Sequence, residues 1–161
     1  MFENHYLMNE KLYLEYVSKA LYKKIIRLGV VLFILGVVLY YFNYSNTLRY
    51  SMLALIFVGL YTIVFVPVLY AKKLVEYSKK LNNGKIETTI VKFNEKIEMD
   101  EGLCHLEFDY SQIHDIMETK SFIVLRLTEY SSILVFKDGF INSNKEDFMK
   151  FIKEKTNLTG V

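Results

Sequence analysis

Cysteine, proline, tryptophan and glycine are scarce in this chain of 161 residues. A single cysteine excludes a disulfide framework and a zinc site built from several cysteines. One proline and seven glycines exclude collagen-like and other low-complexity classes that are rich in these residues. The charged fraction of 24% is too high for a chain embedded wholly in lipid, and the hydrophobic fraction of 52% is too high for a disordered chain.

The net charge of +2 is the sum of two halves of opposite sign. Residues 1–85 carry eleven Lys and Arg against four Asp and Glu, a balance of +7, whereas residues 86–161 carry nine against fourteen, a balance of −5. Blocks of opposite charge usually have different neighbours. Because the C-terminal half is acidic and would be repelled by phosphate backbones, we do not expect nucleic acid as a partner.

Two long apolar runs lie back to back in the basic half. Residues 28–48 contain no charge, and after Arg49 a second uncharged run covers residues 50–71. About 20 apolar residues cross a hydrocarbon core of roughly 30 Å. We therefore expect a transmembrane helical hairpin at residues 28–71, with spans at about 28–47 and 50–71. The alternative is a pair of buried helices in a soluble core, although such helices are rarely apolar on every face.

Basic residues flank this hairpin on one side. Lys19, Lys23, Lys24 and Arg27 precede the first run, Lys72, Lys73, Lys79 and Lys80 follow the second, and the tip holds only Arg49. The positive-inside rule then predicts a multi-pass protein of the cell membrane with both termini in the cytoplasm. At the inner interface, near anionic lipids of the inner leaflet, we expect Lys23, Lys24, Arg27, Lys72 and Lys73.

Gly29 and Gly36 lie seven residues apart, on one face of the first predicted span. Small residues allow two helices to approach closely. We expect these glycines to pack within the hairpin, and the alternative is packing between copies in a homo-oligomer. Because the predicted spans contain no acidic, basic or histidine side chain, we do not expect a transport pathway.

The segments next to the hairpin also have helical patterns. Residues 1–27 are predicted to form an N-terminal amphipathic helix, and residues 72–85 a basic stalk. Two apolar stripes are expected to pair below the membrane, one of Leu14, Val17 and Leu21, the other of Leu74, Tyr77 and Leu81.

Beyond Gly84 the hydrophobic pattern becomes alternating, which indicates strands. The predicted strands are residues 86–93, 96–100, 103–108, 113–118, 122–127 and 132–136, and a helix follows at about 144–155. Ser143 and Glu146 have the spacing of a capping box for that helix. The predicted fold class is an α+β membrane protein, in which a cytoplasmic antiparallel-sheet domain at residues 86–161 is closed by a C-terminal helix. We expect this domain to fold alone.

No motif for catalysis, cofactor binding or a metal is found. The chain has no Gly-rich phosphate loop, nucleophile elbow or HExxH pattern. Cys104 and His105 are adjacent, but neighbouring side chains on a strand point to opposite faces, so one metal cannot easily take both. Cys104, Leu106 and Phe108 are expected to face inward.

Polar side chains gather on the opposite face of these strands. A candidate partner-binding face is predicted at Glu98, His105, Glu107 and Asp109. Carboxylates and histidine could also form a hydrolytic or metal site, but nothing in the spacing fixes ligand geometry, and a solvated acidic face explains the same residues. We therefore expect a binding protein that is not an enzyme and has no cofactor.

Three segments are similar to one family. Residues 108–116 (FDYSQIHDI) match an aromatic–x–x–Ile–x–x–Ile strand, residues 133–140 (ILVFKDGF) match an Ile-Pro-Lys–x–x–Phe segment, and residues 67–73 (PVLYAKK) place a proline near the inner end of a span. In these features the chain resembles the YcxB-like family of bacterial two-span membrane proteins. The family usually has Trp where Tyr110 stands and Pro where Phe136 stands. The resemblance implies a pleckstrin-homology-like (PH-like) C-terminal domain and no enzymatic activity.

Two functions are consistent with this sequence. The first is a membrane-anchored, non-enzymatic interaction or regulatory module, whose cytoplasmic domain binds a protein partner. The alternative is a self-protection, immunity-type protein against a bacteriocin or membrane-active toxin, in which the spans intercept the toxin. A PH-like fold also invites a lipid-headgroup site near its first hairpin, but residues 94–98 are mixed in charge, so we do not expect one there.

Overall fold

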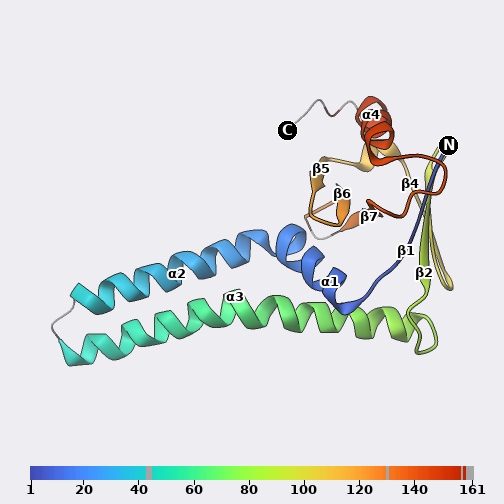
Figure 1. Cartoon of the computed structure of the whole chain (residues 1–161). Helices are drawn as coiled ribbons and strands as arrows, with labels where there is room; N and C mark the ends of the chain where they lie inside the picture. The colour runs from blue at the N-terminus through green and yellow to red at the C-terminus, as the bar shows by residue number, and fades with distance from the viewer. Residues whose placement is uncertain (43–44, 130, 157, 159–161) are drawn as a thin grey trace.

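Two long antiparallel helices project from a domain of two small sheets (Figure 1). The computed structural model describes residues 1–42, 45–129, 131–156 and 158. The N-terminal half comprises β1 (Phe2–Leu7), α1 (Glu10–Tyr16), a π-helix (Val17–Leu21), α2 (Lys23–Phe42) and α3 (Asn46–Leu81). The C-terminal half comprises β2 (Thr88–Phe93), β3 (Ile97–Glu101), β4 (Cys104–Phe108), a 3-10 helix (Tyr110–Gln112), β5 (Asp115–Glu118), β6 (Phe122–Arg126), β7 (Ser132–Phe136) and α4 (Lys145–Thr156).

The strands form one four-stranded sheet in the order β1-β2-β3-β4 and one three-stranded sheet in the order β5-β6-β7. All neighbouring strands are antiparallel. The six strands and the helix predicted after Gly84 are confirmed to within two residues at each end. The alternating pattern is reliable here because each strand turns one face toward a shared core.

The first strand, β1, was not expected. Residues 1–27 are predicted as a helix, which is wrong for residues 2–7, because these pair with β2 from Phe2 opposite Phe93 to Leu7 opposite Thr88. Six residues are too few to separate an alternating from a helical pattern with certainty, and the partner strand comes only after both long helices. The sheet domain therefore includes β1, and the predicted boundary at residue 86 is incomplete. A fragment of residues 86–161 lacks this strand, so we no longer expect it to fold alone.

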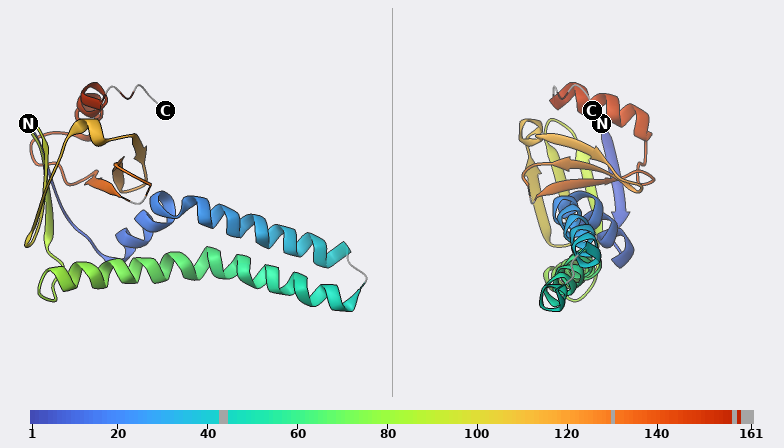
Figure 2. Two further views of the ribbon diagram at one scale, coloured as in Figure 1. Left: turned by 180° about the vertical axis from the view of Figure 1, so that it is seen from behind. Right: turned by 90° about the vertical axis from the view of Figure 1, so that its left-hand side faces the viewer.

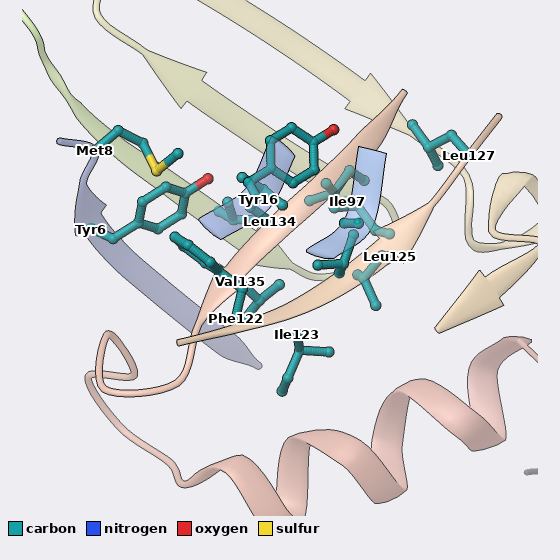
Figure 3. Close-up of a cluster of buried hydrophobic side chains, with 14 of the residues drawn as sticks. Tyr6, Met8, Tyr16, Ile97, Phe122, Ile123, Leu125, Leu127, Leu134 and Val135 are labelled. Atoms are coloured by element: carbon teal, nitrogen blue, oxygen red, sulfur yellow. The ribbon is translucent and has the colours of Figure 1, made fainter. Parts of the chain in front are cut away.

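The core lies between the two sheets and receives side chains from α1 and α4 as well (Figure 3). All four residues from Phe122 to Leu125 on β6 have no exposed surface, so this strand is buried on both faces. Tyr16 of α1 lies close to the same cluster, and Val17 after it is fully buried. On the other side Phe148 of α4 packs edge-on against Phe93, with 4.7 Å between ring centroids. Helix α1 therefore contributes to the core of the sheet domain.

The α4 cap differs from the predicted capping box by one residue. The backbone N–H of Asp147 donates to Asn144 Oδ1 at 2.9 Å, and Asn144 Nδ2 donates to Asp147 Oδ2 at 2.9 Å. Asn144 is thus the N-cap, and the predicted pair of Ser143 and Glu146 is wrong. Ser143 Oγ is instead buried without a hydrogen-bond partner.

Glycines bring α2 and α3 together. A Cβ atom added at Gly29 would lie 3.0 Å from Thr62 Cβ, and one at Gly36 would lie 2.9 Å from Ile56 Cγ1. Gly59 on α3 is tighter still, since its Cβ would come within 2.7 Å of the backbone nitrogen of Phe33. The expectation that Gly29 and Gly36 pack within the hairpin is confirmed.

Both long helices are long and apolar enough to cross a membrane, by length and composition. Only 11% of the most apolar window of each helix is buried. Buried helices of a soluble core would have the opposite property. The two helices therefore present a broad apolar surface that no described part of the chain covers.

Helix α1 packs against the C-terminal part of α3, but only partly through the predicted stripe, in which Leu74 alone is partly buried against the core. The residues of α3 that become buried are Ala71, Val75 and Ser78, whereas Tyr77 remains 63% exposed and Leu81 41% exposed. Small side chains on α3 leave space for the buried tyrosines of α1. The size of the side chains, more than their hydrophobicity, therefore determines which face of α3 packs against α1. On the other side Val17 of the π-helix is fully buried, and Leu14 and Leu21 are partly buried against the core.

Candidate functional site

Most of the predicted partner-binding face is formed by β3 and β4. Glu98 is the cross-strand partner of Glu107, and the next pair on the same side is Asp100 with His105. Asp109 lies apart from them, at the N-cap of the 3-10 helix, where its backbone N–H donates to Gln112 Oε1 at 2.8 Å. The structure thus brings Glu98, His105 and Glu107 together, adds Asp100, and separates Asp109.

His105 lies between two carboxylates. Its Nδ1 is 2.5 Å from Asp100 Oδ1, and its Nε2 is 3.6 Å from Glu107 Oε1. The hydrogen bond to Asp100 raises the pKa of His105 above its ordinary value of 6.5. More of the imidazole is therefore charged at neutral pH, which offsets part of the negative charge of the face. Lys96 Nζ lies 3.7 Å from Glu107 Oε2 and offsets more of it.

Strand β4 is the edge of its sheet, and its inward side chains are less covered than expected. Cys104 is half-buried, and Leu106 is 45% exposed. Leu106 is paired with Met99, which packs against the core, but it stays exposed because an edge strand has a neighbour on one side only. Within the described residues, no group of three or more His, Cys, Asp and Glu side chains could hold a metal ion.

A second surface lies where the π-helix and α2 meet the sheet of β5, β6 and β7. Figures 1 and 2 show this sheet next to the bend between α1 and α2. The junction forms a half-open cavity of about 550 Å³. Its walls include the basic side chains of Lys19, Lys23, Arg27 and Lys120 and the acidic side chains of Glu15 and Glu118.

Both carboxylates in the cavity wall, those of Glu15 and Glu118, bind neighbouring side chains. The two oxygens of Glu15 accept hydrogen bonds from the backbone N–H and the hydroxyl of Ser121, both at 2.8 Å. Burial alone would raise the pKa of Glu15, but these hydrogen bonds outweigh it and lower the pKa. Glu118 Oε2 lies 2.7 Å from Lys145 Nζ and 3.1 Å from Lys137 Nζ, and these contacts lower its pKa.

The basic residues predicted at the membrane interface fall into three groups. Lys23 and Arg27 line the cavity, and Lys24 forms an ion pair of 2.9 Å with Glu129. Lys72 and Lys73 lie on α3, where Lys73 Nζ is 5.9 Å from the centre of the Tyr70 ring. Only two of the five therefore share a cavity.

Lys19 and Lys120 are the basic residues of the cavity that were not predicted as site residues. A signal for Lys19 exists, since Lys19, Lys23 and Arg27 follow one another at intervals of four residues. No local pattern indicates Lys120, because the turn between β5 and β6 reaches α2 only through the tertiary fold.

A family model matches the part of the chain that carries most of these features. The model is described as YcxB-like protein, and it matches residues 93–152. We call these residues, which are similar to that family, the YcxB-like region. The region runs from the last residue of β2 into α4, so it includes the β3–β4 face and the turn between β5 and β6, and it leaves out β1 and the two long helices. The resemblance predicted from sequence is confirmed for this region. Neither the curated proteins nor the solved structures contain a match to the chain.

Proposed function

We propose that the protein is a membrane-anchored, non-enzymatic interaction or regulatory module. In this proposal α2 and α3 cross the membrane as a hairpin, and the sheet domain with its YcxB-like region binds a protein partner in the cytoplasm. The apolar surface of the two helices supports the anchor, because uncovered apolar side chains on this scale are unstable in water.

The single observation that carries the proposal is the pairing of β1 with β2 across the hairpin. Strand β1 precedes α2, and β2 follows α3, yet the two strands are hydrogen-bonded over six residue pairs. Backbone pairing between them requires both ends of the hairpin to lie on one side of any membrane that it crosses. The pairing therefore favours two crossings over one.

The flanking charges favour the cytoplasm for that side. The basic residues before α2 and near the end of α3 lie at the end of the hairpin that carries the sheet domain. Aromatic side chains mark the same level, since the rings of Tyr22 and Tyr70 are 4.4 Å apart. Tyrosines at the boundary of an apolar helix pair are typical of a membrane interface.

We further propose that the sheet domain is PH-like. Support comes from its four-stranded and three-stranded antiparallel sheets and from the C-terminal helix packed on their core. The hairpin is then an insertion between the first and second strands of the domain. This arrangement explains why the YcxB-like match lies wholly after the hairpin.

Binding is favoured over chemistry by the state of the titratable groups. His105 is exposed and paired with Asp100 on an open sheet surface. A catalytic acid or base would instead lie in a shielded cleft. Exposed charges of this kind steer the approach of a partner, so the β3–β4 face is the proposed contact. The self-protection alternative stays a prediction.

Site-directed labelling tests the topology. In a Cys104→Ser background, Ser45→Cys places a thiol at the hairpin tip and Glu146→Cys places one on α4. A membrane-impermeant maleimide added to intact cells is expected to label the tip variant, and to label the α4 variant only after the membrane is opened. Labelling of the α4 variant in intact cells would contradict the proposal.

Partner capture tests the binding role. Crosslinking in membranes is expected to recover a protein partner with the native chain and to lose it with Glu98→Lys and Glu107→Lys together. A matched control is the pair Glu146→Lys and Glu154→Lys on α4, which makes the same change in charge. Equal capture by both double variants would remove the β3–β4 face from the proposal.

A further inference from the structure

The basic wall of the junction cavity is built from residues on both sides of the bend before α2 and from one turn. Lys19 lies on the π-helix before the bend at Tyr22, and Lys23 and Arg27 lie four residues apart on the first turns of α2. Lys120 reaches the same cavity from the turn between β5 and β6. Four cations from two distant parts of the chain therefore face a single space.

The four cations outnumber the free carboxylates of the cavity wall. Among the described residues none of the four forms an ion pair, and Glu118 is paired with Lys137 and Lys145. Glu15 keeps its negative charge, because its hydrogen bonds come from the neutral Ser121, and it offsets only part of the positive charge. Lysines elsewhere on this surface do have partners, as Lys24 has in Glu129. Cations in excess at one site repel one another, and an anion placed between them relieves that repulsion.

The size and chemistry of the cavity fit a phosphate group. A volume of about 550 Å³ lies within the range of roughly 300–1,000 Å³ that is typical of small-molecule sites. Arg and Lys are the side chains that bind phosphate by charge-assisted hydrogen bonds. Ile26 and Met117 add apolar surface to the same wall, which suits a phosphate attached to a carbon chain.

The position of the cavity next to the start of the apolar helix α2 indicates the source of such a phosphate. Tyr22, whose ring packs on Tyr70, precedes Lys23 directly. The cavity thus lies at the proposed membrane surface, where lipid phosphates are concentrated and where the long side chain of Arg27 can extend outward from the start of the apolar segment.

We propose that this cavity binds a negatively charged phosphate group, supplied by the headgroup of an anionic phospholipid or by a soluble phosphate ester. Lys19, Lys23, Arg27 and Lys120 hold it. The lipid source rests on the membrane placement in the proposed function, whereas the phosphate chemistry rests on the cavity itself. The site is separate from the β3–β4 hairpin region, where the sequence gives no reason to expect headgroup binding.

Binding is tested with the full chain purified in an uncharged detergent. The ligands are dioctanoyl phosphatidylglycerol, dioctanoyl phosphatidylcholine as the zwitterionic control, and glycerol 3-phosphate as the soluble phosphate. Native mass spectrometry or calorimetry gives the dissociation constants. The variants are Lys23→Gln with Lys120→Gln, and a matched control of Lys72→Gln with Lys73→Gln, which removes the same charge at the membrane surface but outside the cavity.

The expected result is that the native chain prefers phosphatidylglycerol to phosphatidylcholine by about tenfold or more, and that the cavity variant loses this preference while the control keeps it. Tighter binding of phosphatidylglycerol than of glycerol 3-phosphate identifies a lipid site, and equal binding identifies a site for soluble phosphate esters. Equal affinity of the native chain for the two lipids would overturn the proposal, as would equal losses in both double variants.

Two further measurements separate loss of the site from loss of the fold and from loss of the membrane anchor. The variant Lys23→Arg with Lys120→Arg keeps the charges and is expected to retain binding, which separates loss of charge from loss of fold. The fraction of each variant in the cell membrane reports on the anchor alone. A chain that stays in the membrane but shows no preference between the two lipids refutes the site and leaves the proposed function intact, whereas loss from the membrane counts against the anchor.

Discussion

Asn4 hydrogen-bonds both backbone groups of Phe136. Its Nδ2 donates to the carbonyl oxygen at 2.8 Å, and its Oδ1 accepts from the N–H at 2.9 Å. Asn4 belongs to β1 in the four-stranded sheet, and Phe136 ends β7 in the three-stranded sheet. One fully buried side chain therefore joins the two sheets.

Replacing this side chain is expected to destabilise the whole domain. Asn4→Ala leaves the N–H and the carbonyl of Phe136 without these partners, and each buried unpaired group costs about 1–3 kcal/mol. Denaturant unfolding of the full chain in detergent measures the loss. Asn142→Ala, at an exposed position, is the control and is expected to change stability little. Equal stability of the two variants would show that β1 is not an integral strand.

A second prediction concerns the close approach of Gly139 to β1. The backbone N–H of His5 donates to the Gly139 carbonyl at 2.8 Å, and a Cβ at Gly139 would collide with the His5 carbonyl and the Asn4 amide. Gly139→Ala is expected to push β1 away, at a cost of about 1–3 kcal/mol. Hydrogen exchange should then speed up at the β1 amides, while Asp138→Ala next to it leaves them protected. Unchanged exchange in the glycine variant would contradict this contact.

The α4 cap gives a third prediction, because two neighbouring polar residues differ in role. Asn144→Ala removes the N-cap and is expected to cost about 1 kcal/mol. Ser143→Ala removes a buried hydroxyl that has no partner, so it is expected to be neutral or stabilising. Thermal unfolding of the two variants compares them directly. A larger loss for the serine variant would restore the capping box expected from sequence.

The pH dependence of the acidic face gives a fourth prediction. The pKa of His105 is raised by its hydrogen bond to Asp100, so the protonated ring is favoured in the folded chain. The resulting stabilisation is complete below the unfolded pKa of about 6.5 and is lost as the pH rises through the higher folded pKa. An NMR titration is expected to show the raised pKa, and Asp100→Asn should lower it toward the ordinary value. Asp109→Asn is the charge-matched control, and an equal shift in both variants would argue against a direct Asp100–His105 bond.

The sequence predicts the parts of this fold that repeat a pattern over enough residues. The six strands after Gly84 follow from their alternating pattern, and the two apolar helices follow from the length of their uncharged runs. Pairings between distant segments produce no such pattern in the sequence. Nothing near Asn4 indicates that it bonds to Phe136, and nothing near Lys120 indicates that it shares a cavity with Lys23.

Contacts that depend on small side chains are also hard to predict from the sequence. The stripe of Leu74, Tyr77 and Leu81 is the more hydrophobic face of α3, yet α1 packs on Ala71, Val75 and Ser78. An amphipathic pattern ranks residues by hydrophobicity, whereas close helix packing depends on shape. Strand alternation does predict which side chains share a surface, so Glu98, His105 and Glu107 lie on one side of β3 and β4, whereas Asp109 lies apart from them; their role as a partner-binding face stays a prediction.

The insertion of the hairpin between β1 and β2 imposes an order on biosynthesis. Strand β1 leaves the ribosome first, but its partner is not made until both long helices have been synthesised. Until then the backbone of β1 is unpaired, and its apolar side chains have no core to pack against. The pairing of Phe2 with Phe93 thus becomes one of the last steps of maturation, a long-range contact that forms slowly. A chain in which α2 and α3 pack together late would leave the β2 edge open, so the four-stranded sheet is completed only after the hairpin has formed.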